Sequence, residues 1–123
     1  MAVGQCAGGV VRAVVVYDGR VLLVAQPDRW GLPAGVPEAG ETAAASAARA
    51  VYELTGYLVD GAQTLASPDG GMPAVVCQLL SESPSGGGSL ARAQVRWVAL
   101  AEAVGHADVP VAVRSYLRGH MPA

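Results

Sequence analysis

Four residue types are missing from this chain of 123 residues, which contains no Lys, Ile, Asn or Phe. Its eight basic residues are therefore all Arg; they lie singly along the chain, and the formal net charge is −2. A protein that follows nucleic-acid phosphates needs clustered positive charge, and this sequence has no such cluster. The composition therefore disfavours a nucleic-acid polymer as the partner.

Cysteine is scarce too. Cys6 and Cys77 are the two thiols, and neither belongs to a Cys-x-x-Cys pair, so a zinc site or a thioredoxin-like site has no support. Isolated thiols are typical of proteins in a reducing compartment. The N-terminal segment lacks a basic stretch followed by a long apolar run, and Arg12 interrupts the one candidate. We therefore expect a cytoplasmic protein with no signal peptide and no membrane partner.

Charged residues are few as well. They make up 15% of the chain against 52% hydrophobic residues, a balance too apolar for a disordered segment. The length suits one hydrophobic core, so we expect a single domain over residues 1–123. Residues 81–89 are rich in Gly and Ser, and such small side chains make too few contacts to offset the cost of ordering the backbone. A flexible loop is expected there.

The N-terminal third of the chain predicts a hairpin followed by a loop. Two runs rich in Val and Leu, residues 10–17 and 20–26, flank Asp18-Gly19, a dipeptide that favours the two-residue turn of a β-hairpin. Pro and Gly then recur from Pro27 to Gly40, too often for a helix or a strand. We interpret that segment as a loop.

The next segment predicts the most secure helix. Residues 42–55 are mostly Ala with Arg, Glu and Leu, with Thr42 as the N-cap and Gly56 placed for a left-handed C-terminal turn. A short helix should begin at Pro110, because three apolar residues repeat at helical spacing before Gly119. Those three residues are Val109, Val113 and Leu117. Strands are expected over 58–66, 73–80 and 94–100.

One pattern at fixed spacing carries functional meaning. It consists of Gly35, five residues, Glu41, seven residues, and then the stretch from Arg49 to Gly56. This spacing resembles the Nudix box, in which Gly, Glu and Arg-Glu-aliphatic-x-Glu-Glu-x-Gly follow one another at these intervals. The entry Trp-Gly-Leu-Pro-Ala-Gly at 30–35 and Arg-Trp-Val at 96–98 are also similar to family motifs. The resemblance covers nearly the whole chain.

The resemblance implies a fold, a reaction and a set of roles. The fold class would be α/β, a Nudix-type α/β/α sandwich with a central mixed sheet, and the reaction would cleave a diphosphate linkage in a nucleoside diphosphate derivative. Mg²⁺ or Mn²⁺ would polarise the phosphates and help to generate the attacking hydroxide. The implied catalytic residues are Glu53, Glu41 and Arg49, with Glu53 and the Ala34 carbonyl as metal ligands. Gly35, Gly40 and Gly56 would have backbone roles.

Two residues depart from the box, because Ala50 and Leu54 stand where the family usually has Glu. On a helical wheel of about 100° per residue, both extend an apolar stripe that also holds Ala47 and Val51. We therefore expect both to be buried against the sheet and the metal ion to be weakly bound or absent in the free protein. Ala50→Glu should restore part of the metal binding, whereas Leu54→Glu should risk burying an unpaired carboxylate.

Two functional hypotheses stay open at this point. The first is a slow, metal-dependent hydrolase, since Mg²⁺ is commonly held by one or two carboxylates together with substrate phosphates. The second is a non-catalytic module that binds a small nucleotide-type ligand or a protein partner.

The roles of several acidic residues also stay open. Arg49 and Glu53 are at the spacing of an ordinary helix-surface ion pair. Glu38 is either a loop ligand or a solvated residue, and Glu82 is a candidate late-loop acid. The sequence names neither a substrate nor an oligomeric state.

Overall fold

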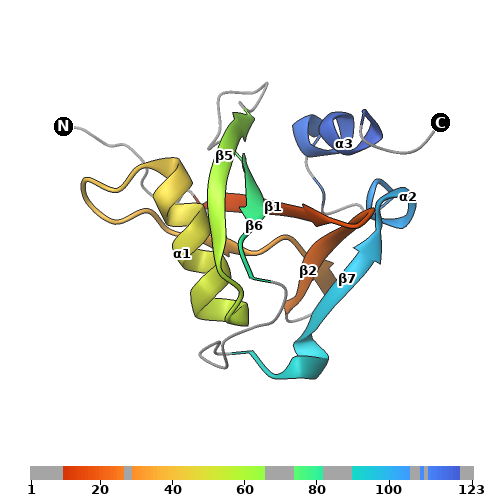
Figure 1. The fold of residues 1–123 in the computed structure, drawn as a ribbon, viewed down its shortest axis with the longest axis horizontal. Coiled ribbons are helices and arrows are strands. Elements are labelled where there is room, and N and C mark those ends of the chain that lie inside the picture. The colour runs from red at the N-terminus through yellow and green to blue at the C-terminus, as the bar shows by residue number, and fades with distance from the viewer. Residues whose placement is uncertain are drawn as a thin grey trace.

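The computed structural model describes residues 10–26, 29–65, 74–81, 90–105, 109 and 111–119. Figure 1 shows the strands, which form one sheet, and the helices that pack against it. The strands are β1 (Val11–Tyr17), β2 (Arg20–Gln26), β3 (Arg29–Gly31), β4 (Ala34–Gly35), β5 (Val59–Leu65), β6 (Ala74–Leu79) and β7 (Val95–Ala99). The helices are α1 (Ala43–Thr55), α2 (Leu100–Ala103) and α3 (Val111–Arg118), and the single turn η1 (Arg92–Gln94) is a 3₁₀ helix.

The chain begins with the hairpin that the sequence predicts. β1 and β2 pair antiparallel, with Tyr17 opposite Arg20. Between them, Asp18 has φ of 53° and Gly19 has φ of 73°. Two successive residues in the left-handed region form the turn whose twist matches that of the flanking strands. The hairpin prediction is confirmed to within one residue at its start.

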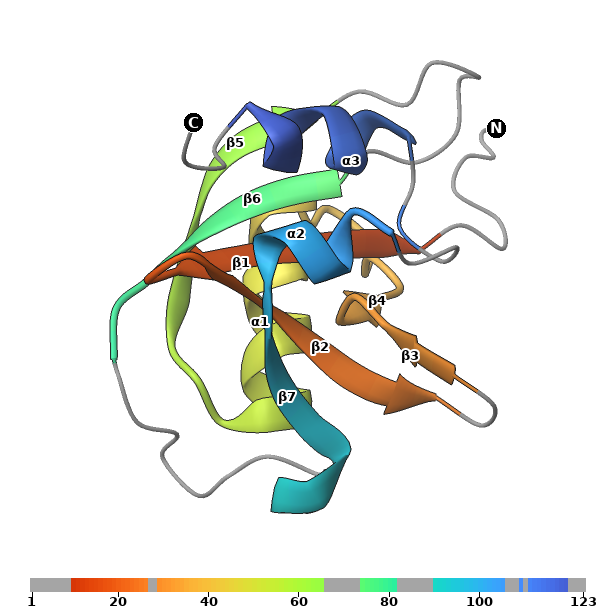
Figure 2. The ribbon, with the colours of Figure 1, turned by 90° about the vertical axis from the view of Figure 1, so that its right-hand side faces the viewer.

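Within the described residues the sheet has seven strands and mixes parallel with antiparallel pairs. Its order is β3-β2-β1-β6-β5, while β4 pairs with β1 and β7 pairs with β2. β1 and β6 are parallel, from Arg12 opposite Ala74 to Val15 opposite Cys77, and the other pairs are antiparallel. Figure 2 shows β1 at the centre, with β6 on one side and β2 on the other. The predicted central mixed sheet is confirmed.

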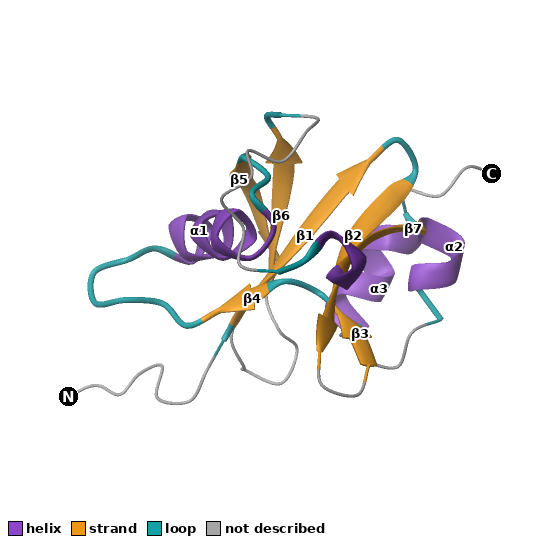
Figure 3. Cartoon of the chain, turned by 90° about the horizontal axis from the view of Figure 1, so that it is seen from below, coloured by secondary structure: helices purple, strands orange, loops and turns teal. Residues whose placement is uncertain are grey.

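Two apolar clusters lie on opposite faces of this sheet, because successive strand side chains point to opposite sides. In β1, Val11, Ala13 and Val15 pack with α1 residues such as Val51. Val14 instead joins the cluster that contains the buried residues of α2 and α3. Figure 3 shows α1 on one side and α2 and α3 on the other. The fold is therefore the expected α/β/α sandwich.

The long helix has both predicted caps. The Thr42 side chain accepts a hydrogen bond from the Ala45 N–H at 3.1 Å, which satisfies one of the free donors at the helix start. Gly56 has φ of 83°, and its N–H donates to the Tyr52 carbonyl at 2.9 Å, the left-handed ending that Gly allows at low cost. The predicted range 42–55 is therefore correct, with Thr42 as the cap.

The C-terminal helix also agrees with the pattern. Val109, Val113 and Leu117 are all buried in the cluster shared with α2. The Gly119 N–H donates to the Ser115 carbonyl at 3.2 Å, at the end of α3. Helical spacing of three apolar residues therefore did predict a docked helix. Pro110, the expected first residue, lies outside the described residues.

Three sequence predictions need correction or lie beyond the described residues. The segment from Pro27 to Gly40 is not wholly a loop, because β3 pairs with β2 and β4 pairs with β1. The strand expected to reach Leu100 ends at Ala99, and α2 begins at Leu100. The loop at 81–89 falls almost entirely outside the described residues, as does Glu82. Within the described ranges, no helix has the length and apolar character needed to cross a bilayer.

Candidate functional site

Arg49 is the residue that connects the other parts of the box by hydrogen bonds. Its guanidinium donates to both carboxylate oxygens of Glu41, from Nε to Oε2 at 2.8 Å and from Nη2 to Oε1 at 2.8 Å. Nη2 also donates to the Val36 carbonyl at 2.9 Å, and Nη1 donates to Glu53 Oε1 at 3.2 Å. The planar fork of Arg suits such bidentate pairing. One side chain from the middle of α1 therefore joins the preceding loop to the last turn of the helix.

The loop before α1 is held by reciprocal contacts around Glu41. The Glu38 N–H donates to Glu41 Oε1 at 3.0 Å, and the Glu41 N–H donates to the Glu38 carbonyl at 2.9 Å. The hydrogen bond from Arg49, followed by that from the Glu38 backbone, lowers the pKa of Glu41 to about 2. Glu41 is therefore an ionised structural partner of Arg49. Glu38 contributes its backbone, while its side chain is exposed.

Glu53 has the more open carboxylate. Its side chain is 59% exposed, against 14% for Glu41, and among the described residues it forms an ion pair with Arg49. Ala34, whose carbonyl is the implied loop ligand, is half-buried in β4 opposite Arg12 of β1. Since β4 also packs against α1, Ala34 and Glu53 lie on two elements in mutual contact.

Gly35 and Ala50 explain why the box is closely packed here. A Cβ at residue 35 would lie 2.8 Å from the Ala50 Cβ, a separation that carbon atoms do not adopt without a shift. Gly35 does not have positive φ, unlike Gly40 at 77° and Gly56 at 83°. The backbone-conformation role expected for all three glycines thus holds for Gly40 and Gly56. Gly35 instead provides space for α1 to approach β4.

The buried face of α1 differs from the predicted stripe. Ala50 is buried, with 3% of its surface exposed, as expected. Leu54 is half-buried, so that prediction is correct only in part. Ser46, which is not part of that stripe, is fully buried, and its Oγ has no hydrogen bond of good geometry within the described part of the chain. It lies near enough to Glu41 to make a small contribution to lowering the pKa of that carboxyl.

The donor set allows a test of whether a metal ion would fit. Mg²⁺ needs six oxygen ligands, often supplied by one or two carboxylates, waters and substrate phosphates. Across the described ranges, no three His, Cys, Asp or Glu residues gather to hold an ion. Both oxygens of Glu41 accept from Arg49, so the open carboxylate on α1 is that of Glu53, and Glu38 has an exposed carboxylate in the preceding loop. These residues fit one loosely held ion that depends on substrate phosphates, and they do not fit a two-ion site.

One group of residues was not recognised from the sequence as a unit. Trp97 Nε1 donates to the Tyr57 hydroxyl at 3.1 Å, and Tyr17 lies against the same indole. Each aromatic residue read singly indicates packing. The β2–β7 register and the end of α1 bring these distant positions together. Nothing local in the sequence indicates this cluster.

The sandwich and the Arg49 cluster define the class, a Nudix-type domain. The NUDIX domain family matches residues 8–118. The chain belongs to this family. Among proteins of curated function, none matches the sequence significantly.

Solved structures with the same fold include three useful comparisons. An ADP-ribose pyrophosphatase from Streptococcus suis superposes with a TM-score of 0.64 at 20% identity, over 88% of this chain and 86% of that one. A UDP-X diphosphatase gives 0.67 at 19% identity, over 98% of this chain and 66% of that one. A NUDIX hydrolase from Nitrosomonas europaea gives 0.61 at 24% identity, over 93% and 73%. At these identities the likeness establishes the fold.

Proposed function

We propose that this chain is a slow hydrolase that cleaves the diphosphate linkage of a small nucleoside diphosphate derivative with the help of Mg²⁺ or Mn²⁺. The observation that carries the proposal is the Arg49 cluster, which fixes the loop before α1 and leaves the Glu53 carboxylate mostly exposed. An ordinary surface ion pair would not need the additional contacts to Glu41 and the Val36 carbonyl. The cluster supports a site that is still organised around its ligand residue.

Each residue would have a distinct role. Glu53 would hold the ion together with the Ala34 carbonyl, and the ion would polarise the phosphates and lower the pKa of bound water. Arg49 would orient Glu53, and Glu41 would orient Arg49. Gly35 would allow α1 to approach the strand that carries Ala34. The named activities of the Streptococcus suis pyrophosphatase and the UDP-X diphosphatase support the substrate class, a nucleoside diphosphate joined to another group.

The reaction should be slow because the helix offers one carboxylate. Ala50 is buried beside Gly35, and Leu54 is half-buried, so neither position supplies negative charge to a second ion. Each 1.4 kcal/mol or so of lost transition-state stabilisation slows a step about tenfold. A site that relies on substrate phosphates to complete its coordination should therefore bind metal weakly in the free protein.

A second candidate function rests on the packing of Ala50. Because its Cβ fills the space beside Gly35, the position has become part of the core, as expected if selection for metal binding had ended. The chain would then be a non-catalytic module that binds a nucleotide or a protein partner in the same cleft. A cytoplasmic location and a single domain stay predictions, the former resting on the isolated thiols.

A product-release assay separates the two functions. The purified chain is incubated with Mg²⁺ or Mn²⁺ and a panel that includes ADP-ribose and UDP-sugars, and monophosphate release is followed over hours. Slow, metal-dependent release from at least one compound is expected, and chelation of the metal should stop it. Binding of a panel compound without any release would support the module instead.

A further inference from the structure

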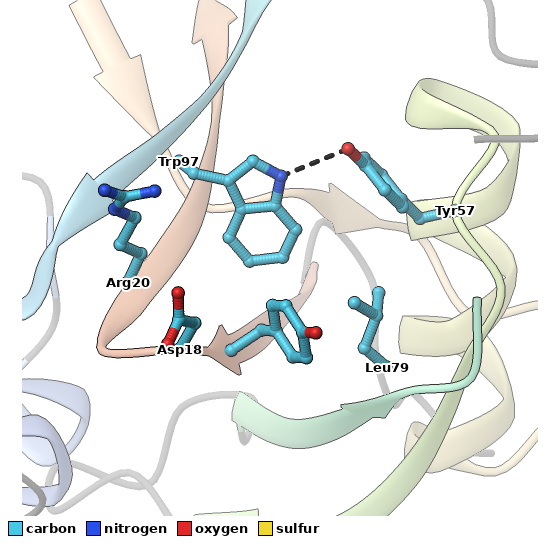
Figure 4. Close-up of a pocket in the computed structure, with 6 residues that line it drawn as sticks. Asp18, Arg20, Tyr57, Leu79 and Trp97 are labelled. Carbon is cyan, nitrogen blue, oxygen red and sulfur yellow. Dashed lines mark hydrogen bonds between the residues drawn. The ribbon is translucent and has the colours of Figure 1, made fainter. Parts of the chain in front are cut away.

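A pocket lies at the β1–β2 turn, on the sheet face that carries α1. Its cavity has a volume of about 250 Å³. Figure 4 shows the side chains of Trp97, Tyr57 and Leu79 around one space, with Asp18 and Arg20 on the hairpin side. None of the residues of the Arg49 cluster lines it. The lining residues are Tyr17, Asp18, Arg20, Tyr57, Leu79 and Trp97.

This pocket holds half of the aromatic residues of the protein. The chain has two Trp and four Tyr, and three of these six line the cavity. The Tyr57 and Trp97 rings meet edge to face at 5.6 Å and 81°, and the Tyr17 and Trp97 rings at 6.3 Å and 60°. Tyr17 is 43% exposed, so its side chain is only partly packed into the core. Three aromatic side chains in mutual contact therefore line one pocket.

The polar groups of the pocket come from its rim. The Trp97 N–H already donates to the Tyr57 hydroxyl, which fixes these two rings relative to each other. Asp18 and Arg20 are both exposed on the hairpin, and neither has an ion-pair partner in the described part of the chain. Asp18 is held at φ of 53° in the turn, and Arg20 is the first residue of β2. A hydrogen-bond acceptor from the turn and a cation from the first residue of β2 therefore lie at the rim of the aromatic pocket.

We propose that this pocket binds a small molecule with a planar aromatic ring and an anionic group. The ring would lie against the aromatic side chains, and the anion would face Arg20, whose guanidinium suits carboxylates and phosphates. Asp18 would accept a hydrogen bond from a ring donor and would disfavour ligands of high negative charge. Pockets for drug-sized ligands span about 300–1,000 Å³, so this smaller cavity suits one or two fused rings.

The hairpin rim of this pocket is separate from the Arg49 cluster, although Tyr57 on its other side lies four residues after Glu53. Val11, at the start of β1, pairs with Gly35, whereas Tyr17 at its end pairs with Arg20. Six residues of extended strand span roughly 20 Å, so the hairpin rim lies that far from the loop that precedes α1. The proposal therefore does not rest on hydrolysis and goes beyond the proposed function.

The two tryptophans allow a direct test by NMR of the ¹⁵N-labelled protein, since each gives one indole N–H signal. The Trp97 signal is assigned with Trp30→Phe. Indole-3-acetate and AMP are titrated as the carboxylate and phosphate arms, with indole and adenosine as neutral controls. We expect at least one acid to shift the Trp97 signal at millimolar concentration and leave the Trp30 signal unchanged. The acid that binds more tightly identifies the preferred anion.

Variants make the test specific. Arg20→Gln should weaken binding of the acid about tenfold, as expected for loss of a charge-assisted hydrogen bond, and should leave its neutral counterpart unaffected. Arg118→Gln, an exposed Arg on α3, is the matched control. Glu53→Gln should not change the titration, which keeps this outcome apart from that of the proposed hydrolase. Absence of any Trp97 shift, equal shifts of both indoles, or equal binding of acid and neutral compound would overturn the proposal.

Discussion

The Cβ of Ala50 occupies the space that a side chain at Gly35 would need, since the two Cβ atoms would be 2.8 Å apart. This close approach brings β4 against the helix that carries Arg49 and Glu53. It also explains the residue types at both positions, because the close approach requires a small side chain at position 50 and none at position 35. The metal-binding helix of the family is here packed against β4 by an apolar contact.

Gly35→Ala should destabilise the fold by about 1–3 kcal/mol, the usual range for overpacking a core. Ala50→Gly in the same protein should recover part of that loss by removing the opposing Cβ, despite its own cost of about 1 kcal/mol in helix propensity. Urea unfolding of the two single variants and the double variant measures the coupling. Strict additivity of the two effects would contradict the close approach.

Adding carboxylates tests the metal site. The sequence assigned the packing risk to Leu54→Glu, but Ala50 is the more deeply buried position. We therefore expect Leu54→Glu to bind Mn²⁺ more tightly than the parent with a modest loss of thermal stability. Ala50→Glu should lose more stability, since its side chain must displace β4 or carry an unpaired charge into the core. Calorimetric titration and thermal unfolding of both variants check these expectations. An Ala50→Glu variant that is more stable than Leu54→Glu would contradict them.

Acid should weaken the loop that precedes α1. The pKa of Glu41 falls from an ordinary 4.5 to about 2 because Arg49 binds its carboxylate. A lowered pKa in the folded state contributes stability above pH 4.5 that is lost as the pH falls through about 2. The stability difference between the parent and Arg49→Gln should therefore shrink over that window. Urea midpoints from pH 7 to 2 measure it, with Arg118→Gln as the control, and a constant difference would argue against the pair.

The docking of α3 depends on Leu117, which is fully buried in the cluster shared with α2. Leu117→Ala should cost about 2–5 kcal/mol, the range for deleting a buried Leu side chain. Arg118→Ala, at the next and exposed position, should change stability by at most about 0.5 kcal/mol. Equal effects of the two substitutions in urea unfolding would show that α3 is not packed as described.

Long periodic segments were predictable from the sequence, and short paired ones were not. The hairpin and α1 contain their own signals, Asp18-Gly19 and the caps at Thr42 and Gly56. β3 and β4 are three and two residues long, so their pairing with distant strands, which local preference does not encode, decides their conformation. The spacing of the box likewise grouped Glu41, Arg49 and Glu53, which are in contact in the structure.

Burial on α1 was harder to predict for a physical reason. A wheel divides the helix into faces, but α1 contacts both β4, which pairs with β1, and β5, which pairs with β6, and these contacts widen its buried surface. Ser46 is therefore enclosed, while Leu54 stays half-buried at the end of the helix. The aromatic pocket combines residues of β1, β2, β6 and β7 with Tyr57, which follows α1, and so depends on long-range strand pairing.

The rate of diphosphate cleavage by Glu53→Gln tests the central claim most directly. The substrate is the panel compound that the parent cleaves fastest, and Glu102→Gln, an exposed acid on α2, is the control. Loss of the open carboxylate of α1 should slow metal-dependent release at least about tenfold, a change of about 1.4 kcal/mol in the barrier, while Glu102→Gln keeps the parent rate. Equal rates for the parent and Glu53→Gln would contradict a site built on this residue.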